Sequence, residues 1–196
     1  MEKLSNENPR ELTYTIQNIV VKSCLNQEID LNHILTNVEN CKYNSATFPG
    51  LFMRIPDPKC VILLFKSGNI IITGVLRFIH IPAIVEQLIF SLNQKTQYKI
   101  NIDSITTEIV NIVITADYKQ RIDLNLGILR LRNSLYEPEV FPGIIYKNKS
   151  PHKAVFLIFS TGKVVMTGIK NPEEIEALLI HLGKLLEKNK LFLEIK

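Results

Sequence analysis

The pattern of hydrophobic and polar positions along this chain passes through the same series of strand-like and helix-like segments twice. Residues 13–24 are rich in β-branched side chains and partly alternate, which predicts a strand. Apolar positions then recur at helical spacing over residues 31–39, where Asp30 is placed to cap a helix. The shorter apolar runs that follow predict three strands near residues 51–55, 60–66 and 69–74, and a helix over residues 83–93.

The second half of the chain repeats this order. It predicts, in turn, a strand over 107–117, a helix from Asp123 to about Asn133, strands near 143–147, 153–160 and 163–168, a helix with Asn171 as cap and Pro172 at its first position that runs to about Asn189, and a closing strand over Leu191–Ile195. Each half therefore predicts an antiparallel sheet that carries its helices on one face.

Landmark residues indicate that the order repeats because the sequence is duplicated. Phe48-Pro49-Gly50 returns as Phe141-Pro142-Gly143, a spacing of 93 residues (141 − 48), and Asn18-Ile19-Val20 returns at the same spacing as Asn111-Ile112-Val113. A fixed spacing over distant landmarks is typical of two copies of one unit. We expect a short flexible N-terminal tail (residues 1–12), a first repeat (residues 13–103) and a second repeat (residues 104–196), with the two repeats forming one structural unit.

The composition is typical of a folded protein, and we expect it to stay inside the cell. The chain has 196 residues, of which 46% are hydrophobic, so it can bury a sizeable core. No uninterrupted apolar run reaches the roughly 20 residues that span a bilayer, and the first dozen residues lack the apolar core of a signal peptide. Cys24, Cys41 and Cys60 are odd in number and form no CxxC pair, which is typical of reduced thiols.

The residues that carry chemistry show no catalytic arrangement. The four histidines have no metal-ligand spacing, no serine lies in a GxSxG turn, and no glycine-rich loop matches a phosphate cradle. We expect no enzyme activity, cofactor, metal or small-molecule substrate. The net charge of +4 is shared as +1 over residues 1–103 (10 basic against 9 acidic) and +3 over residues 104–196 (13 against 10). This excess permits a nucleic-acid partner without demanding one.

Several short motifs occur in a specific combination. They are Gln17-Asn18-Ile19-Val20, Tyr43-Asn44, Met53-Arg54-Ile55, Asp57-Pro58-Lys59, Leu64-Phe65-x-Ser67-Gly68 and Tyr136-Glu137-Pro138-Glu139-Val140-Phe141-Pro142-Gly143. Together they resemble the TATA-box-binding protein family over roughly residues 13–190. The resemblance implies an α+β saddle of two pseudo-symmetric halves, with a curved ten-stranded antiparallel sheet against DNA and four helices on the convex side. It also implies a general transcription initiation factor that binds the minor groove of A·T-rich, TATA-type promoter DNA, bends it and nucleates the preinitiation complex.

The resemblance assigns wedge roles to four phenylalanines. The family inserts two phenylalanines per half between base steps, and the matching positions here are Phe48, Phe65, Phe141 and Phe159. A wedge that unstacks bases has to be flat, stiff and apolar, and Phe meets that need without leaving a polar group unpaired. Without the family pattern, Phe65 and Phe159 would be interpreted as core residues and the other two as loop anchors.

Further positions match the family's contacts to the groove floor and to phosphates. Asn18 and Asn111 match a central pair that reaches base-edge acceptors, which the minor groove offers at A·T pairs. The alternative is a turn residue at a strand end, and the symmetric placement of the two asparagines favours the base contact. The floor positions are Val20, Leu63, Ile71 and Thr73 in the first repeat and Val113, Leu157, Val165 and Thr167 in the second. The basic positions are Arg54 in the first repeat and Lys147, Lys163 and Lys170 in the second.

The first repeat departs from the family at its basic positions. Residues that are not basic stand where Lys or Arg is expected, at Ala46, Thr47, Asn69 and Leu76, and Lys22 replaces a small hydroxyl residue on the first repeat's DNA face. Each phosphate contact adds close to one unit of salt slope. We therefore expect the chain to bind DNA more weakly and with less dependence on salt than a typical member of the family. We also expect the second repeat to bind the DNA more tightly than the first.

Two partner surfaces are also implied. The loop that docks transcription factor IIB in the family matches Glu137, Glu139 and Val140. The helix near residues 78–94 is apolar where relatives carry basic residues for factor IIA, so that contact is doubtful. Either drift over a deeper core or a hydrophobic patch for a different partner accounts for the change.

Two function classes stay open. The four phenylalanines and two asparagines favour a DNA-bending initiation factor. The lost basic residues favour the alternative, a diverged paralogue that acts mainly as a protein-interaction scaffold with weak DNA binding. Met53-Arg54-Ile55 leans toward a eukaryotic source, and we expect the protein in the nucleus, or in the cytoplasm if its source is archaeal.

Overall fold

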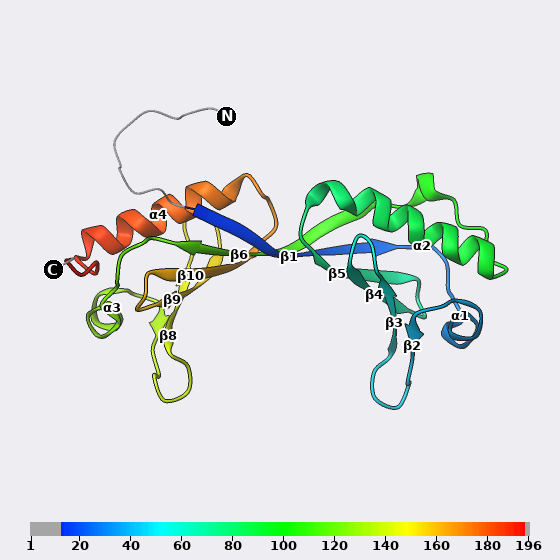
Figure 1. Cartoon of the computed structure of the whole chain (residues 1–196), viewed down its shortest axis with the longest axis horizontal. Coiled ribbons are helices and arrows are strands. Elements are labelled where there is room, and N and C mark those ends of the chain that lie inside the picture. The colour runs from blue at the N-terminus through cyan, green and yellow to red at the C-terminus, as the bar shows by residue number, and fades with distance from the viewer. Residues whose placement is uncertain (1–12, 195–196) are drawn as a thin grey trace. The chain divides into compact units, whose positions relative to one another are not determined.

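The computed structural model describes residues 13–194, so the expected tail at residues 1–12 lies outside the described residues. Over the described part, the chain forms ten strands of one antiparallel sheet and four α-helices (Figure 1). It divides into two compact units. The first unit is formed by residues 16–112, and the second by residues 113–194 together with residues 13–15.

The first repeat folds in the predicted order. Its elements are β1 (Thr13–Cys24), α1 (Leu31–Asn37), β2 (Cys41–Lys42), β3 (Gly50–Ile55), β4 (Cys60–Phe65), β5 (Asn69–Val75) and α2 (Ile81–Lys95), with short 3₁₀ turns at Phe78–His80 and Ile102–Ser104. The strands lie in the order β2-β3-β4-β5-β1. The predicted cap is confirmed, because Asp30 Oδ1 accepts hydrogen bonds from the backbone N–H groups of Asn32 (2.8 Å) and His33 (3.1 Å).

The second repeat folds in the same way. Its elements are β6 (Thr107–Asp117), α3 (Leu124–Arg130), β7 (Ser134–Leu135), β8 (Gly143–Asn148), β9 (Ala154–Phe159), β10 (Lys163–Ile169) and α4 (Glu174–Lys188), with the strands in the order β6-β10-β9-β8-β7. The sequence did not predict β2 and β7, because a two-residue strand shows no periodicity.

Two predicted boundaries near the end of the chain were wrong. Helix α4 begins at Glu174, not at Pro172, because the turn before it is closed by bonds that span three residues, from the backbone N–H of Glu174 to the backbone oxygen of Asn171 and from that of Ile175 to that of Pro172 (both 3.2 Å). The closing strand predicted over Leu191–Ile195 does not form in the described residues: within residues 191–194, strand pairing is confined to a single bridge between Phe192 and Ile122, and Ile195 lies outside the described residues. The partner segment turns into α3 at Leu124, so the pairing has no room to extend.

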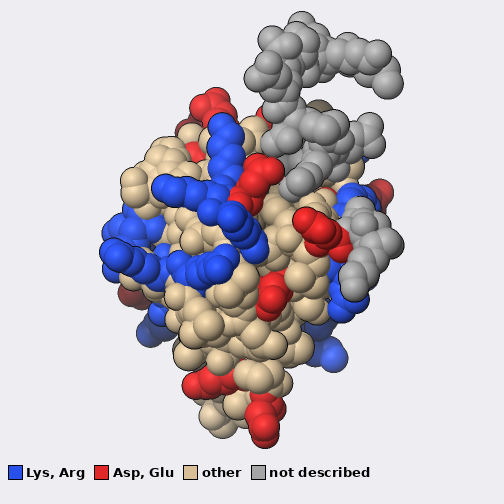
Figure 2. All heavy atoms as spheres, turned by 90° about the vertical axis from the view of Figure 1, so that its left-hand side faces the viewer, with Lys and Arg blue, Asp and Glu red and all other residues tan. Residues whose placement is uncertain are grey.

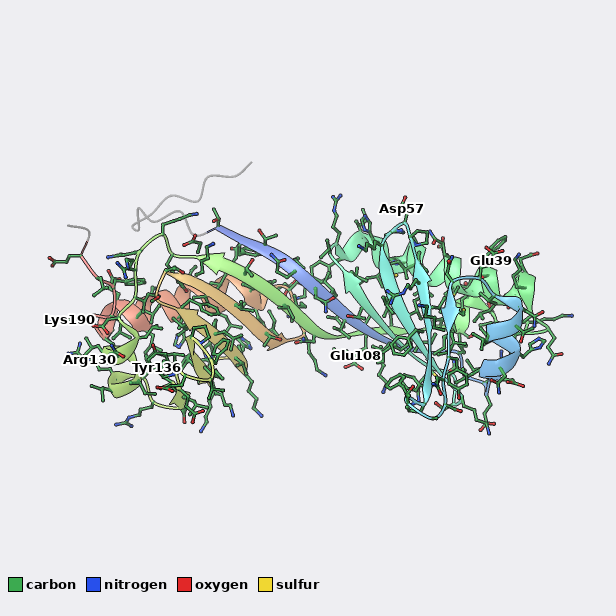
Figure 3. All side chains as sticks on the ribbon, turned by 60° about the horizontal axis from the view of Figure 1, so that its bottom comes forward. Glu39, Asp57, Glu108, Arg130, Tyr136 and Lys190 are labelled. Atoms are coloured by element: carbon green, nitrogen blue, oxygen red, sulfur yellow. The ribbon has the colours of Figure 1, made fainter. Side chains whose placement is uncertain are left out.

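The hydrophobic core of each unit lies between its helices and one face of its strands. In β4, Ile62 and Leu64 are fully buried, whereas Leu63 between them is half-buried. The buried strand residues join Ile84 and Leu88 of α2 in one cluster. In both units the long helix lies behind the strands when the opposite face is viewed (Figure 3). Alternate strand residues thus separate into a covered face and an open face.

Adjacent leucines in β4 test this separation. We expect Leu64→Ala to lower the free energy of unfolding by about 2–5 kcal/mol, because it leaves a cavity in the core. Leu63→Ala should cost only about 1 kcal/mol, since it removes atoms from a half-open face. Urea unfolding followed by circular dichroism measures both. Equal losses in the two variants would contradict an open face at Leu63.

Candidate nucleic-acid interface

The open face of each unit is a row of apolar side chains. In the first unit, Leu63 pairs across the sheet with Phe52 on one side and Ile71 on the other. In the second, Leu157 pairs with Ile145 and Val165 in the same register. These six side chains are all half-buried, because only their cross-strand neighbours shield them. Contiguous apolar surface of this kind is typical of a binding site.

Two phenylalanine pairs lie at equivalent ends of these faces. The ring centroids of Phe48 and Phe65 are 6.0 Å apart, and those of Phe141 and Phe159 are 5.6 Å apart, with interplanar angles of 59° and 62°. All four rings are half-buried, so the interpretation of Phe65 and Phe159 as core residues does not hold. Phe52 adds a third ring to the first pair, with its centroid 5.1 Å from that of Phe48.

A glycine beneath each pair allows the rings to lie against the sheet. Gly50 is the cross-strand partner of Phe65, and Gly143 is that of Phe159. A Cβ atom on Gly50 would lie 2.7 Å from Phe48 Cε1. A Cβ atom on Gly143 would lie 3.0 Å from Phe141 Cε1 and 2.9 Å from the backbone oxygen of Ile158. Both strand starts therefore require a residue without a side chain, which explains the repeated Phe-Pro-Gly motif.

Asn18 is held in place by strand β5. Its Nδ2 donates to Thr73 Oγ1 (3.1 Å), and its Oδ1 accepts from the backbone N–H of Gly74 (2.7 Å). A primary amide carries two N–H donors, and Thr73 takes one of them. The side chain thus bridges two strands and is not a turn residue at a strand end. Asn111 is half-buried at the equivalent position of β6.

Basic side chains flank the open faces unequally. Arg54 on β3 and Lys147 on β8 are exposed at equivalent positions, opposite Val61 and Val155. The ends of β10 carry the exposed Lys163 and Lys170, whereas the ends of β5 carry Asn69 and Leu76. Lys22 is exposed on β1 directly opposite Ile71, so the first unit places this cation within its open face.

A hollow of about 650 Å³ opens beside the second phenylalanine pair. Pro142, Phe159, Thr161 and Lys163 line it, and so does Asp117. The backbone N–H of Lys119 donates to Asp117 and lowers the pKa of its carboxyl, more than the opposing effect of burial raises it. This site therefore combines a flat apolar wall with a cation and a stably ionised carboxylate.

The loop between β7 and β8 presents acidic and apolar side chains. Glu137 and Glu139 are exposed, and Val140 is 80% exposed. The backbone N–H groups of Val140 (2.9 Å) and Phe141 (2.8 Å) both donate to the backbone oxygen of Glu137. These two bonds hold the loop in a tight turn. Figure 2 shows acidic side chains gathered at the tip where Figure 1 places this loop.

Other kinds of site find no support in the part of the chain that the structure describes. Within residues 13–194, no group of three or more His, Cys, Asp or Glu side chains could hold a metal ion. No helix in the same range is long and apolar enough to cross a membrane.

Comparison with known families identifies this duplicated arrangement. The family model described as "Transcription factor TFIID (or TATA-binding protein, TBP)" matches the chain twice, at residues 13–94 and 106–189. The chain belongs to the TATA-binding protein family. The resemblance drawn from the motifs is therefore confirmed, together with the ten-stranded antiparallel sheet and the four helices of the described chain.

Individual members of the TATA-binding protein family agree with this assignment. The chain is 40% identical over 173 residues to the TATA-box-binding protein of Methanothrix thermoacetophila, covering 85% of this chain and 91% of that protein. It is 39% identical over 167 residues to the TATA-box-binding protein of Aeropyrum pernix, covering 82% and 77%. The solved structure of Methanococcus jannaschii TBP matches with a TM-score of 0.81 at 32% identity, covering 89% of this chain and 98% of that one.

Sequence reasoning missed the residues that support the phenylalanine pairs. Phe52 was not singled out, although it lies two residues before Arg54 in β3 and therefore on the same, open face of the sheet. Gly50 and Gly143 were treated only as landmarks. Their role follows from the strand register that the structure gives, in which each pairs directly with a proposed wedge residue of this TATA-binding protein family member.

The two glycines give a test of the ring geometry. We expect Gly143→Ala to lower the free energy of unfolding by about 1–3 kcal/mol, because a backbone oxygen blocks the new methyl group. Gly50→Ala should cost less, since only ring atoms that can rotate lie in its way. Unfolding measurements with NMR of the aromatic side chains would distinguish them. Unchanged Phe141 resonances in Gly143→Ala would contradict the close approach.

Proposed function

We propose that this chain binds the minor groove of A·T-rich, TATA-type duplex DNA and initiates assembly of the transcription machinery there. The observation that carries the proposal is the pairing of Phe48 with Phe65 and of Phe141 with Phe159 on open apolar sheet faces. Family membership supports the same function, because the relatives reported above are named TATA-box-binding proteins.

The phenylalanine pairs act as wedges between base steps. Apolar wedges that enter the minor groove unstack a step and kink the duplex, a mode for which this family is itself a type example. In each unit the two rings lie side by side at a tilt, so both can serve as the wedge. The glycine below each pair keeps the rings against rigid strands and not on a mobile loop.

The apolar rows favour A·T pairs because they offer no hydrogen-bond acceptor to a G·C pair. The minor groove of a G·C pair carries an amino donor that A·T pairs lack. Side chains such as Leu63 and Leu157 offer that donor no acceptor, so a G·C pair would bury an unpaired polar group. The second amide N–H of Asn18, which Thr73 does not take, suits the acceptors of A·T pairs. Asn111 stands at the equivalent position of the second unit.

Phosphate contacts come from cations at the ends of the strands. Arg54 serves in the first unit, and Lys147, Lys163 and Lys170 serve in the second. Basic side chains that neutralise phosphates release counterions, and each release adds affinity at low salt. The second unit therefore holds the DNA backbone more firmly than the first.

The acidic loop docks a protein of the transcription factor IIB type. Its exposed Glu137 and Glu139 flank a peptide turn that the hydrogen bonds to Glu137 keep rigid. Val140 next to them offers an exposed apolar contact. A partner with basic side chains around an apolar pocket fits this surface. The relatives reported above come from archaea, which favours the cytoplasm over the nucleus as the setting.

The wedge mechanism is tested with a Phe141→Ala, Phe159→Ala double variant. We expect the wild type to prefer a duplex with a TATA-type core over a G·C-rich duplex, and the double variant to lose that preference, because no ring enters the base step. Fluorescence anisotropy at several salt concentrations measures both affinities. Phe90→Ala is the control, since Phe90 is an exposed phenylalanine on α2, away from the open face.

Two outcomes would contradict the wedge mechanism. The first is wild-type binding without A·T preference, and the second is a double variant that binds as well as the wild type. Either result would favour the alternative function, a scaffold for protein partners with weak DNA binding. The observation that favours this alternative is that positions 69 and 76 carry Asn69 and Leu76 and not basic side chains.

Exchanging strand-end residues between the repeats tests the phosphate contacts. We expect Asn69→Lys, Leu76→Lys to strengthen DNA binding and to steepen the dependence of log K on log salt by about 2, since each new contact adds ~0.9. The reciprocal variant Lys163→Asn, Lys170→Leu should flatten the slope by a similar amount. Salt-titrated anisotropy measures both. Slopes that stay constant would show that these positions do not reach phosphates.

A further inference from the structure

Two adjoining hollows form a groove on the first unit, away from the phenylalanine pair. One, of about 310 Å³, lies between α2 and the end of β3 and is lined by Phe90 and Gln87. The other, of about 610 Å³, lies at the ends of β3 to β5 and is lined by Leu76. Both share Ile55 and Pro56 as lining residues, so they are continuous. We call this combined surface the Phe90 groove.

Large apolar side chains are exposed at both ends of the Phe90 groove. Phe90 is 67% exposed on α2, and Leu76 is 55% exposed directly after β5. Neither side chain belongs to the buried cluster beneath α2. Exposed aromatic and aliphatic side chains that border a hollow are typical of surfaces that bind another protein.

The second repeat shows that the fold does not require these apolar residues. Aligning the buried leucines Leu88 and Leu182 of the two long helices places Lys184 at the position of Phe90. The residue after β10 is Lys170 where the first repeat has Leu76. The last residue of β8 is Asn148, whose Nδ2 donates to the backbone oxygen of His152 (2.6 Å), where β3 ends in Ile55.

The charges around the Phe90 groove are mainly positive. Arg54, Lys59 and Lys95 line it. Glu39 lines it as well, but its Oε1 lies 4.0 Å from Lys95 Nζ, so its charge is partly matched. Asp57 lies at the outer end of the β3–β4 hairpin and Glu39 beside α1 (Figure 3).

Cys60 adds no negative charge to this surface. Burial raises the pKa of its thiol to about 11, so the side chain stays neutral near pH 7. The groove therefore combines an apolar floor with an excess of cations.

We propose that the Phe90 groove binds a short amphipathic segment of a partner protein, in which acidic side chains stand beside large apolar ones. Apolar side chains of the segment fill the hollows around Ile55 and Pro56, and its carboxylates lie against Lys59 and Lys95. A basic segment would meet like charges, and a purely polar one would leave the hollows empty.

This inference does not rest on the proposed DNA binding, and its test is kept separate from it. Arg54 lines the groove and also belongs to the proposed phosphate contacts. Variants of Arg54 or Leu76 would therefore mix the two functions. Phe90 takes no part in the proposed DNA interface, and its exposure means that it can be replaced without opening the core.

The test selects a displayed library of random peptides on the full chain. We expect enrichment of sequences that place Asp or Glu next to Phe, Leu or Ile. Synthetic copies of them should bind the wild type at least tenfold more tightly than Phe90→Lys, which installs the residue of the second repeat. Ile180→Lys is the matched control, because Ile180 is an exposed apolar residue of α4, 51% exposed, outside the groove.

Several results would overturn the proposal. They are a selection that enriches nothing or enriches Lys and Arg, peptides that bind Phe90→Lys as tightly as wild type, and peptides that Ile180→Lys weakens equally. Sedimentation of the free chain adds one more, since self-association abolished by Phe90→Lys would assign the groove to a second copy. Both variants should still bind the TATA-type duplex, so a failure of the groove and a failure of DNA binding are distinguishable.

Discussion

The arrangement of this molecule depends on covering only one face of its apolar strands. Strands β4 and β9 are apolar at every position, yet helices pack against alternate residues alone. Ile62 and Leu64 gain a complete apolar environment, while Leu63 keeps only its neighbours across the sheet. Hydrophobic stabilisation grows with the apolar area removed from water, so the covered face supplies most of the stability. The open face is left for binding.

The sequence predicted the order of elements because the duplication supplied each signal twice. The strand over Thr13–Cys24 and the cap at Asp30 were predicted from local pattern and are as expected. The start of α4 was not, because Asn171 followed by Pro172 suits a helix cap and a preceding turn equally well. The backbone bonds from Glu174 to Asn171 and from Ile175 to Pro172, each spanning three residues, mark the turn. A short C-terminal apolar run likewise does not reveal that its partner segment becomes a helix.

The candidate site was harder to predict from the sequence than the fold. In an uninterrupted run such as Cys60–Phe65, periodicity does not say which residues face the helices, so Phe65 could be placed on the open face only through a family resemblance. The anchoring of Asn18 by Thr73 and Gly74 depends on a contact across 55 and 56 positions of the chain. The close approach of the rings to Gly50 and Gly143 depends on strand register, which a single sequence does not fix.

Duplication also separates what the fold requires from what function selects. Positions that pack under the helices stay apolar in both repeats, as Leu88 and Leu182 do. The phenylalanine pairs and their glycines are retained as well, although half-exposed rings add little to stability. At the strand ends and on the outer helix surface the repeats differ in charge, with Leu76 against Lys170 and Phe90 against Lys184. Because neither residue of such a pair is needed for folding, each surface is free to take its own partner. The phenylalanine pairs shared by the two repeats then indicate their common function. The surfaces that differ between the repeats indicate functions that belong to one repeat alone.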